Sequence, residues 1–151
     1  KEGSKNYSEQ KIKGIGLLPL KTTFFKKKLT RQINSKSIWP CQSEINGFEI
    51  HNGQTVLDEI QSSLKINPIF EDSDLGWYKE NNQGGPIAGT YIHGIFENDS
   101  WRAQYINLIR KSKNLPILNK KSISYKEKRQ HIIDNLANEF HKHLNLKSFL
   151  S

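Results

Sequence analysis

His93 is the residue of this sequence that is best placed to do chemistry. It follows a β-prone run from Ile87 to Ile92 and precedes Gly94, and Asn98 and Asp99 then offer a helix start. That order predicts a strand, a tight turn and a helix. In an open α/β sheet, side chains just past the carboxyl end of a strand face the ligand crevice. Because an imidazole titrates near neutral pH, His93 could shuttle protons there or hold a thiol as thiolate, although a histidine that merely ends a strand fits the same pattern.

A second chemically capable pair, Glu49 and His51, lies within the run from Glu44 to His51. Alternation in this run predicts a strand with Phe48 and Ile50 on one face. The carboxylate and the imidazole then lie side by side on the other, polar face. A face that lines a site and a face that is only solvated fit this pattern equally well.

The strands that would carry these residues follow from periodicity and turn signals. The run from Thr22 to Ile33 is rich in Thr and Phe and predicts a strand, whose lysines at 26–28 discourage pairing with another edge. Asn52-Gly53 predicts a turn. The apolar run 14–20 is broken by Gly and Pro and suits a buried connector. Short strands are expected at Ile66–Phe70 and Gly76–Lys79.

Two helices are predicted beyond His93. The first ends before Pro116, and the second begins at Ser124, where Glu127 three residues later completes a capping box. Apolar residues at helical spacing predict a buried stripe on each helix. The stripes consist of Trp101, Tyr105, Leu108 and Ile109 in the first helix, and of Ile132, Ile133, Leu136, Ala137, Phe140 and Leu144 in the second.

No metal site is predicted. His131, His141 and His143 lie on or beside the second helix, and we interpret them as surface residues. His141 and His143 diverge around a helix, and no carboxylate or cysteine completes a tetrahedral ligand set.

Composition bounds the partners and the location. The length of 151 residues suits one domain, and the net charge of +8 admits a polyanionic partner. The lysines are scattered rather than gathered on one face, so no nucleic-acid partner is expected. No apolar run reaches the ~20 residues that span a bilayer, and no signal peptide opens the chain. We therefore expect a cytoplasmic protein without a membrane partner.

The ends and the single cysteine also carry expectations. Cys41 stands alone, which excludes an internal disulfide. The sequence has no Met and opens on Lys1, so we expect a piece of a longer polypeptide. Residues 1–13 are polar and lack periodicity, which predicts a frayed lead-in.

Three ordered stretches resemble a known family. Gly-Ile-Gly-Leu-Leu-Pro-Leu at 14–20 leads to Thr-Thr-Phe at 22–24, Gly-Phe-Glu-Ile-His-Asn-Gly-Gln-Thr follows at 47–55, and Gly-Thr-Tyr-Ile-His-Gly-Ile-Phe-Glu-Asn at 89–98. In this order and spacing they resemble the C-terminal glutaminase domain of the cobyric acid synthase family, relatives of the class I glutamine amidotransferases. The resemblance runs from Gly14 to near the end of the chain and includes the last helix.

The resemblance implies a fold and a reaction. The fold would be α/β: part of a class I glutamine amidotransferase domain, flavodoxin/Rossmann-like, with a mixed sheet and flanking helices, over residues 14–151. Members of the family use ATP and Mg, held in a separate synthetase domain, to amidate carboxylates of adenosylcobyrinic acid a,c-diamide on the way to cobalamin. The glutaminase domain itself needs no cofactor and releases ammonia from glutamine through a cysteine and a histidine.

The resemblance also implies site roles. His93 matches the catalytic histidine, which would hold the thiolate, protonate the departing ammonia and activate water. In the commonest triads a glutamate two residues later orients the histidine, and here that position is Ile95. Glu49 and His51 are assigned to substrate binding, and either could orient His93.

The nucleophile does not match any residue of this chain. In the family it lies in a Gly-rich strand-to-helix elbow upstream of the Gly-Leu-Leu-Pro stretch, before this chain begins. Cys41 follows Pro40, has no glycine neighbour and precedes no helix, so we interpret it as an inert thiol. The chain alone is therefore predicted to be inactive. Two alternatives remain: a related amidotransferase of cell-wall lipid precursors or cobyrinic acid diamide synthesis, and a non-catalytic basic binding module.

Overall fold

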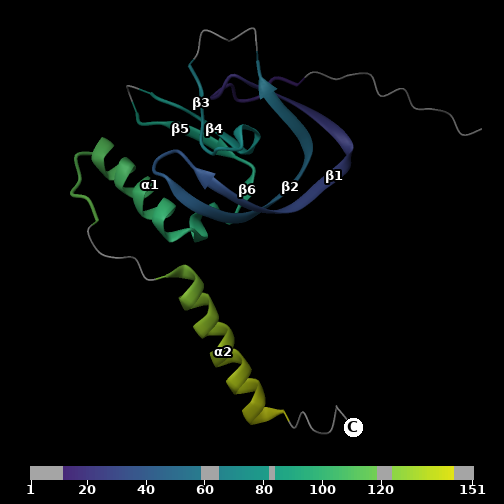
Figure 1. Ribbon diagram of the computed structural model, residues 1–151, viewed down its shortest axis with the longest axis vertical. Coiled ribbons are helices and arrows are strands. Elements are labelled where there is room, and N and C mark those ends of the chain that lie inside the picture. Colours follow the sequence, from purple (N-terminus) through teal and green to yellow (C-terminus); the bar gives the residue numbers. More distant parts are fainter. Residues whose placement is uncertain (1–11, 59–64, 82–83, 119–123, 145–151) are drawn as a thin grey trace, which may run out of the picture.

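The computed structural model describes residues 12–58, 65–81, 84–118 and 124–144. The described residues form six strands and two α-helices, and both α-helices follow the last strand; strands and helices together agree with the predicted α/β class (Figure 1). The elements are β1 (Leu20–Ser37), β2 (Ser43–Leu57), β3 (Asn67–Pro68), the 3-10 helix η2 (Ser73–Leu75), β4 (Gly76–Lys79), β5 (Ile87–Thr90), β6 (Ile92–His93), the 3-10 helix η3 (Ile95–Glu97), α1 (Asp99–Ser112) and α2 (Tyr125–His143).

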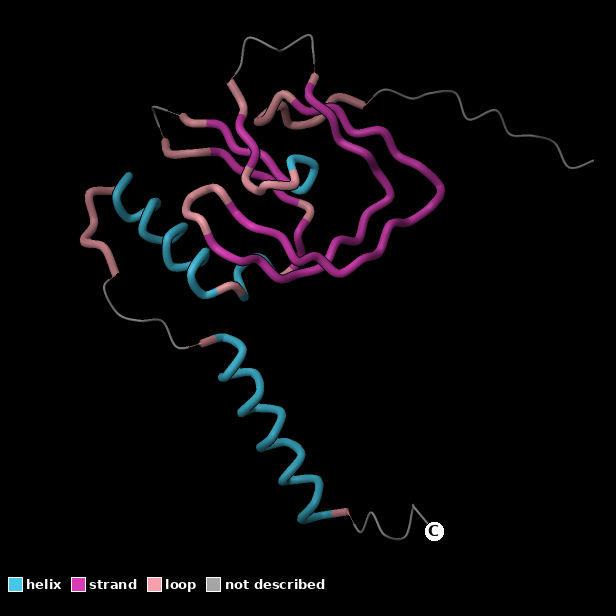
Figure 2. The backbone as a smooth tube through the Cα atoms, viewed as in Figure 1, coloured by secondary structure: helices cyan, strands magenta, loops and turns pink. Residues whose placement is uncertain are grey.

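A long antiparallel ribbon of β1 and β2 dominates the fold, and it curves around the rest of the body (Figure 2). The pairing runs from Leu20 opposite Leu57 to Ser37 opposite Ser43, with a register shift between Phe24 and Leu29 that contains the lysine run. Such a bulge bends a strand and increases its twist.

The predicted turn at Asn52-Gly53 is wrong, because β2 continues through it to Leu57. Gly53 lies opposite Phe24, and a Cβ there would come within 2.6 Å of the Thr22 methyl group. The glycine therefore permits close packing of the ribbon rather than a reversal of the chain.

The six strands of the described residues form two sheets of three, ordered β1-β2-β6 and β3-β4-β5. All strand pairs in the described part of the chain are antiparallel. Tyr91 joins the sheets, because it separates β5 from β6. Its N–H donates to the carbonyl of Leu75 at 2.9 Å, and the Thr90 hydroxyl donates to the same carbonyl at 2.7 Å. These bonds fix the strand that delivers His93.

The core lies between the sheets and α1. The predicted stripe of α1 is confirmed in large part: Trp101 is buried, Tyr105 and Leu108 pack against the core, and Ile109 is exposed. The indole N–H of Trp101 donates to the carbonyl of Trp39 at 3.0 Å, which anchors α1 to the β1–β2 loop. The buried hydrophobic residues are Ile33, Trp39, Ile45, Ile69, Phe70, Leu75, Ile92, Ile95 and Trp101.

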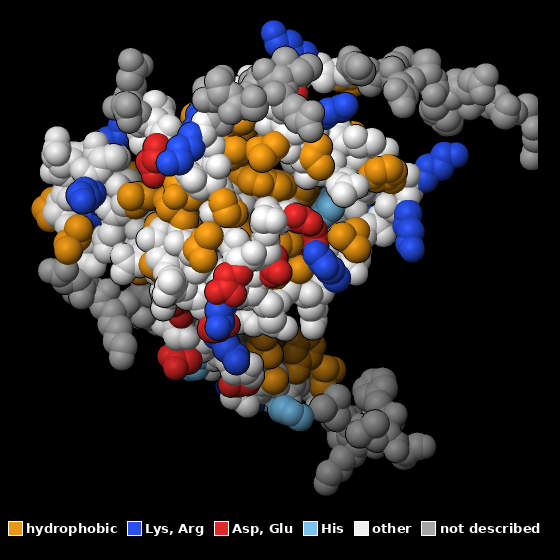
Figure 3. Space-filling model, turned by 45° about the horizontal axis from the view of Figure 1, so that its top comes forward, with side chains coloured by type: hydrophobic (Ala, Val, Ile, Leu, Met, Phe, Trp, Pro, Cys, Tyr) orange, Lys and Arg blue, Asp and Glu red, His pale blue; other side chains and the backbone are white. Residues whose placement is uncertain are grey.

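Helix α2 projects away from the body (Figures 1 and 2). Its start is as predicted, because the Ser124 side chain accepts the N–H of Glu127 at 3.3 Å. The prediction of a buried stripe is wrong, since every residue of α2 is exposed. No other described element covers its apolar side chains, which form a patch on the helix (Figure 3). The helix is tethered at its first residue, where the Tyr125 N–H donates to the Asp99 carboxylate at 3.0 Å.

The segment before β1 also differs from expectation. Residues 12–17 are exposed, and within the predicted connector 14–20 only Pro19 is buried. Most of the lead-in 1–13 lies outside the described residues. The surface histidines are as predicted: His131, His141 and His143 are exposed.

Candidate functional site

His93 ends β6, at the edge of the β1-β2-β6 sheet, and its side chain is exposed. The register places Gln32, Phe48 and His93 in one row across the three strands. The rings of Phe48 and His93 stack, with centroids 5.1 Å apart and planes inclined by 8°. The imidazole is therefore presented on the outer face of the sheet, on top of an aromatic neighbour.

The main chain at His93 is held by two glycines. A Cβ on Gly47 would come within 2.5 Å of the His93 carbonyl oxygen, so no larger residue fits beneath the histidine. Gly94 has φ +79°, a left-handed conformation that side chains disfavour. It turns the chain abruptly into η3. His93 thus lies at the tight turn that the sequence predicts.

Asn98 closes the loop that follows His93. Its Oδ1 accepts the N–H of Asn46 at 2.8 Å, and its Nδ2 donates to the carbonyl of Asn46 at 2.9 Å. Nδ2 also lies 3.0 Å from the carbonyl of Ile95 and 3.3 Å from that of Gly94. The side-chain amide thereby bonds β2 as another strand would, beyond the point where β6 ends. The predicted helix cap is only partly right: Asn98 is the N-cap residue of α1, but its side chain is directed to β2.

Glu49 and His51 lie on the other face of the sheet. Phe48 is opposite His93 in register, whereas Glu49 is opposite Ile92. Side chains alternate along a strand, so Glu49 and His51 point away from the face that carries His93. Neither therefore orients the imidazole of His93.

Alternation along β2 suggests that Phe48 is buried and Glu49 exposed, but the structure shows the reverse. Phe48 is 43% exposed and Glu49 only 3%. The carboxylate can be buried because it is paired: Arg31 Nε donates to Oε2 at 2.6 Å, and His51 Nε2 lies 2.5 Å from Oε1. Burial raises the pKa of Glu49, but the hydrogen bonds and charges of His51 and Arg31 outweigh it and lower the pKa below 4.5.

The inner polar face continues beyond Glu49. The ring of His51 stacks on Tyr91 at a centroid distance of 4.0 Å. The hydroxyl of Tyr91 bonds that of Thr55, which bonds that of Thr22 at 2.7 Å. Nδ1 of His51 is buried without a hydrogen-bond partner in the described part of the chain. This face acts as a polar joint between the ribbon and Tyr91.

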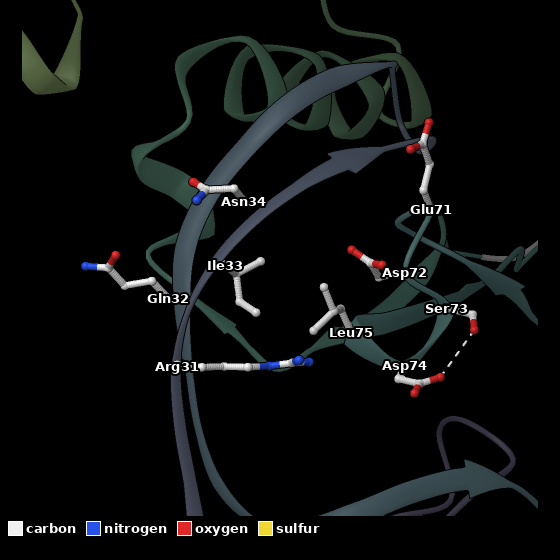
Figure 4. Close-up of a pocket in the computed structure, with 9 residues that line it drawn as sticks. All are labelled: Arg31, Gln32, Ile33, Asn34, Glu71, Asp72, Ser73, Asp74 and Leu75. Carbon is white, nitrogen blue, oxygen red and sulfur yellow. Dashed lines mark hydrogen bonds between the residues drawn. The ribbon is translucent and has the colours of Figure 1, made fainter.

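Two cavities flank this polar joint. The larger, of about 530 Å³, lies between β1 and the η2 segment, and Figure 4 shows Arg31 and Ile33 directed towards Leu75 and Gln32 directed away. Its residues are Arg31, Gln32, Ile33, Asn34, Glu71, Asp72, Ser73, Asp74 and Leu75. The smaller, of about 230 Å³, is lined by Leu20, Thr22, Thr55, Trp77, Gly89, Thr90 and Tyr91. Neither is lined by His93, which lies on an open face.

Cys41 lies in the loop between β1 and β2. Its thiol is 3.9 Å from the Ser43 hydroxyl, and its carbonyl accepts a bond from Ser37 at 2.7 Å. About 16 Å of strand separates Ser43 from Phe48 at ~3.3 Å per residue. Among the described residues no contact joins Cys41 to His93.

Sequence reasoning missed three residues that shape the site. Arg31, Phe48 and Asn98 each act across strands: on Glu49, on His93 and on Asn46 respectively. Only the register brings such pairs together. Once the register is known, the opposite charges of Arg31 in β1 and Glu49 in β2 predict the first of these pairs.

Neither a metal-binding cluster nor a membrane-spanning helix occurs within the described ranges. Residues 12–58, 65–81, 84–118 and 124–144 contain no group of three His, Cys, Asp or Glu side chains arranged for a metal ion. Neither of the helices described has the length and apolar character needed to cross a membrane.

Comparison with known proteins places the chain among amidotransferases. Residues 1–101 match the family model of the CobB/CobQ-like glutamine amidotransferase domain. The cobyric acid synthase of Prochlorococcus marinus (strain MIT 9301) is 95% identical over 151 residues, which are the whole of this chain and 30% of that protein. The cobyric acid synthase of Synechococcus sp. (strain CC9311) is 39% identical over 142 residues, 91% of this chain and 28% of that protein.

The chain thus spans about 30% of the length of these curated relatives. No solved structure matches it.

Proposed function

The chain belongs to the CobB/CobQ-like glutamine amidotransferase family, and from this premise we propose that it is part of the ammonia-supplying glutaminase unit of a cobyric acid synthase. Relatives from 95% to 39% identity that cover at least 91% of the chain carry that name. The whole protein would use the ammonia, with ATP and Mg bound in another domain, to amidate adenosylcobyrinic acid a,c-diamide in cobalamin biosynthesis.

We propose His93 as the catalytic histidine. It would accept the thiol proton as sulfur attacks the amide carbon of glutamine, and pass that proton to the nitrogen as the C–N bond breaks and ammonia leaves. It would then take a proton from water as the water oxygen attacks the thioester, and return it to sulfur as glutamate departs. Each step needs one imidazole nitrogen that the thiol and the substrate can reach.

One observation carries this assignment: the imidazole of His93 is exposed on the sheet face, while its main chain is fixed on both sides. Phe48 and Gly47 hold it from β2, and the turn at Gly94 is closed by Asn98. A general base must keep its ring accessible to substrate and still hold its position. The outer face at His93 meets both conditions.

The nucleophilic cysteine would come from a part of the polypeptide upstream of residue 14. Cys41 does not fit the role, because it lies in the β1–β2 loop and its thiol contacts a serine rather than a base. Residues 14–151 would then form the C-terminal part of the amidotransferase domain, and this chain alone would release no ammonia from glutamine.

Glu49 and His51 as substrate ligands stay a prediction. Both carboxylate oxygens of Glu49 are engaged by Arg31 and His51, and the residue faces away from His93. The contacts favour a role in holding the ribbon against Tyr91. The KM for glutamine of a Glu49→Gln variant separates the two roles, because the loss of a substrate-binding side chain raises KM.

The test compares His93→Ala with His141→Ala in the full-length protein. His141 is an exposed histidine on α2 and serves as the matched control. We expect His93→Ala to lower glutamine hydrolysis by at least about 100-fold, the contribution typical of a general acid–base. Amidation supplied with free ammonia should persist, because the synthetase site is untouched. Unchanged glutamine hydrolysis in His93→Ala would overturn the assignment.

A further inference from the structure

The imidazole of His93 has an unusual set of neighbours for a proton-transfer group. In the part of the chain that the structure describes, its ring takes part in no hydrogen bond or ion pair, and its one ring contact is the stack with Phe48. Ile95, two residues later, is 6% exposed and apolar. Glu49 and His51 are on the opposite face. Among the described residues, no carboxylate is therefore placed to orient the ring.

We propose that Phe48 is the positioning residue of His93, and that it sets the plane of the imidazole by stacking. The inference rests on the proposed role of His93. The two rings are almost parallel, inclined by 8°, and their centroids are 5.1 Å apart. This is the offset stack that aromatic pairs prefer.

Phe48 is firmly placed to do this. It lies on β2, the central strand of its sheet, opposite Gln32 on one side and His93 on the other. A Cβ on its neighbour Gly47 would come within 2.5 Å of the His93 carbonyl oxygen, so the main chains of the two strands lie close together here. The two backbones therefore cannot slide apart without loss of strand pairing, and the phenyl ring remains beside the imidazole.

A stack has a chemical advantage at this position. The two nitrogens of an imidazole lie on the edge of the ring, whereas Phe48 covers a face. The plane is fixed and both nitrogens stay open for proton transfer. The phenyl ring also brings no hydrogen-bonding atom to the imidazole. Phe48 thus restricts the ring without competing with its chemistry.

The test uses Phe48→Leu, Phe48→Tyr and Phe48→Trp in the full-length protein, with Phe24→Leu as control. Phe24 is an exposed phenylalanine on β1, far along the ribbon from His93. Leucine keeps apolar bulk and removes the ring plane. We expect Phe48→Leu to lower kcat for glutamine hydrolysis by about 10- to 100-fold, the cost of a misplaced catalytic group, with KM within about twofold. Phe48→Tyr and Phe48→Trp keep an aromatic ring and should have a kcat near that of the wild type.

A spectroscopic readout is independent of catalysis. In protein isotopically labelled at histidine, the NMR resonances of the His93 ring C–H groups are identified by their loss in His93→Gln. They should move downfield in Phe48→Leu and stay at their wild-type positions in Phe48→Tyr. The proposal is overturned if these resonances do not move in Phe48→Leu, or if Phe48→Leu and Phe48→Tyr lower kcat equally. It is also overturned if Phe48→Leu leaves kcat unchanged while His93→Ala abolishes glutamine hydrolysis. If His93→Ala is itself fully active, the proposed function fails instead, and a shift of the resonances would still show the stack.

Discussion

Removal of the Asn98 side chain should loosen the loop that carries His93. The amide of Asn98 makes two hydrogen bonds to the main chain of Asn46, at 2.8 and 2.9 Å, and shares its remaining donor capacity between the carbonyls of Ile95 and Gly94. In Asn98→Ala these four groups lose their side-chain partner. Within the described part of the chain, no other hydrogen bond then joins the loop after His93 to β2.

The magnitude follows from the bonds that are lost. A hydrogen bond of this type contributes about 0.5–1.5 kcal/mol net, and the two bonds to Asn46 therefore contribute about 1–3 kcal/mol. Asn46 is exposed, so water can replace the lost partner and the lower half of the range is expected. An opening free energy reduced by about 1–2 kcal/mol corresponds to amide exchange roughly 5- to 30-fold faster.

Hydrogen exchange on peptides that cover β2 in the full-length protein measures this directly. The amide of Asn46 should exchange faster in Asn98→Ala, and glutamine hydrolysis should fall with it because His93 is less well held. Asn52→Ala, an exposed asparagine on the same strand, serves as control and should change neither. Unaltered exchange at Asn46 would refute the claim that the Asn98 amide extends the sheet.

Two further outcomes are expected for the full-length protein. Burial raises the pKa of Glu49, but hydrogen bonds from its histidine and arginine neighbours prevail and lower it. The ionised Glu49 therefore stabilises the folded protein fully above pH 4.5, the ordinary value, and this contribution is lost as the pH falls below it. A pH series of thermal unfolding midpoints should show a shallower acid decline for Glu49→Gln than for wild type, and equal declines would contradict the pairing. Gly47→Ala places a Cβ within 2.5 Å of both the His93 carbonyl and the Ile92 side chain, so it should cost about 1–3 kcal/mol and most of the glutaminase activity. Gly14→Ala, with no atom within 4 Å, should be silent in the same melting and activity assays.

Local signals in the sequence were enough for several elements. The capping box at Ser124 marks the start of α2, and the spacing of Trp101 and Tyr105 identifies the inward face of α1. The segment Gly76–Lys79 is a strand with the predicted bounds. These features depend on residues within one turn or one strand of each other, so the information is local.

Signals that depend on partners were misread. A Phe-Glu-Ile-His alternation suggests that the aromatic residue is buried, yet Glu49 is inside because Arg31 and His51 pair with it. Asn52-Gly53 has turn chemistry, yet the ribbon passes through it because Gly53 must make room for Thr22. The apolar stripe of α2 predicts burial, but amphipathicity specifies only that a helix has an apolar face and does not supply the surface to cover it.

The sequence by itself determined the α/β character, the strand and turn at His93, and the ordered motifs that resemble an amidotransferase, because all of these are properties of short segments. Only the tertiary structure decided which side of the sheet each residue occupies. Strand side chains alternate with a period of two, so the register between β2 and β6 sets Phe48 beside His93 and Glu49 beside Ile92. That register depends on contacts between residues more than forty positions apart, such as the bonds of Asn98 to Asn46. The orientation of the proposed catalytic histidine is therefore a property of the fold and not of its motif.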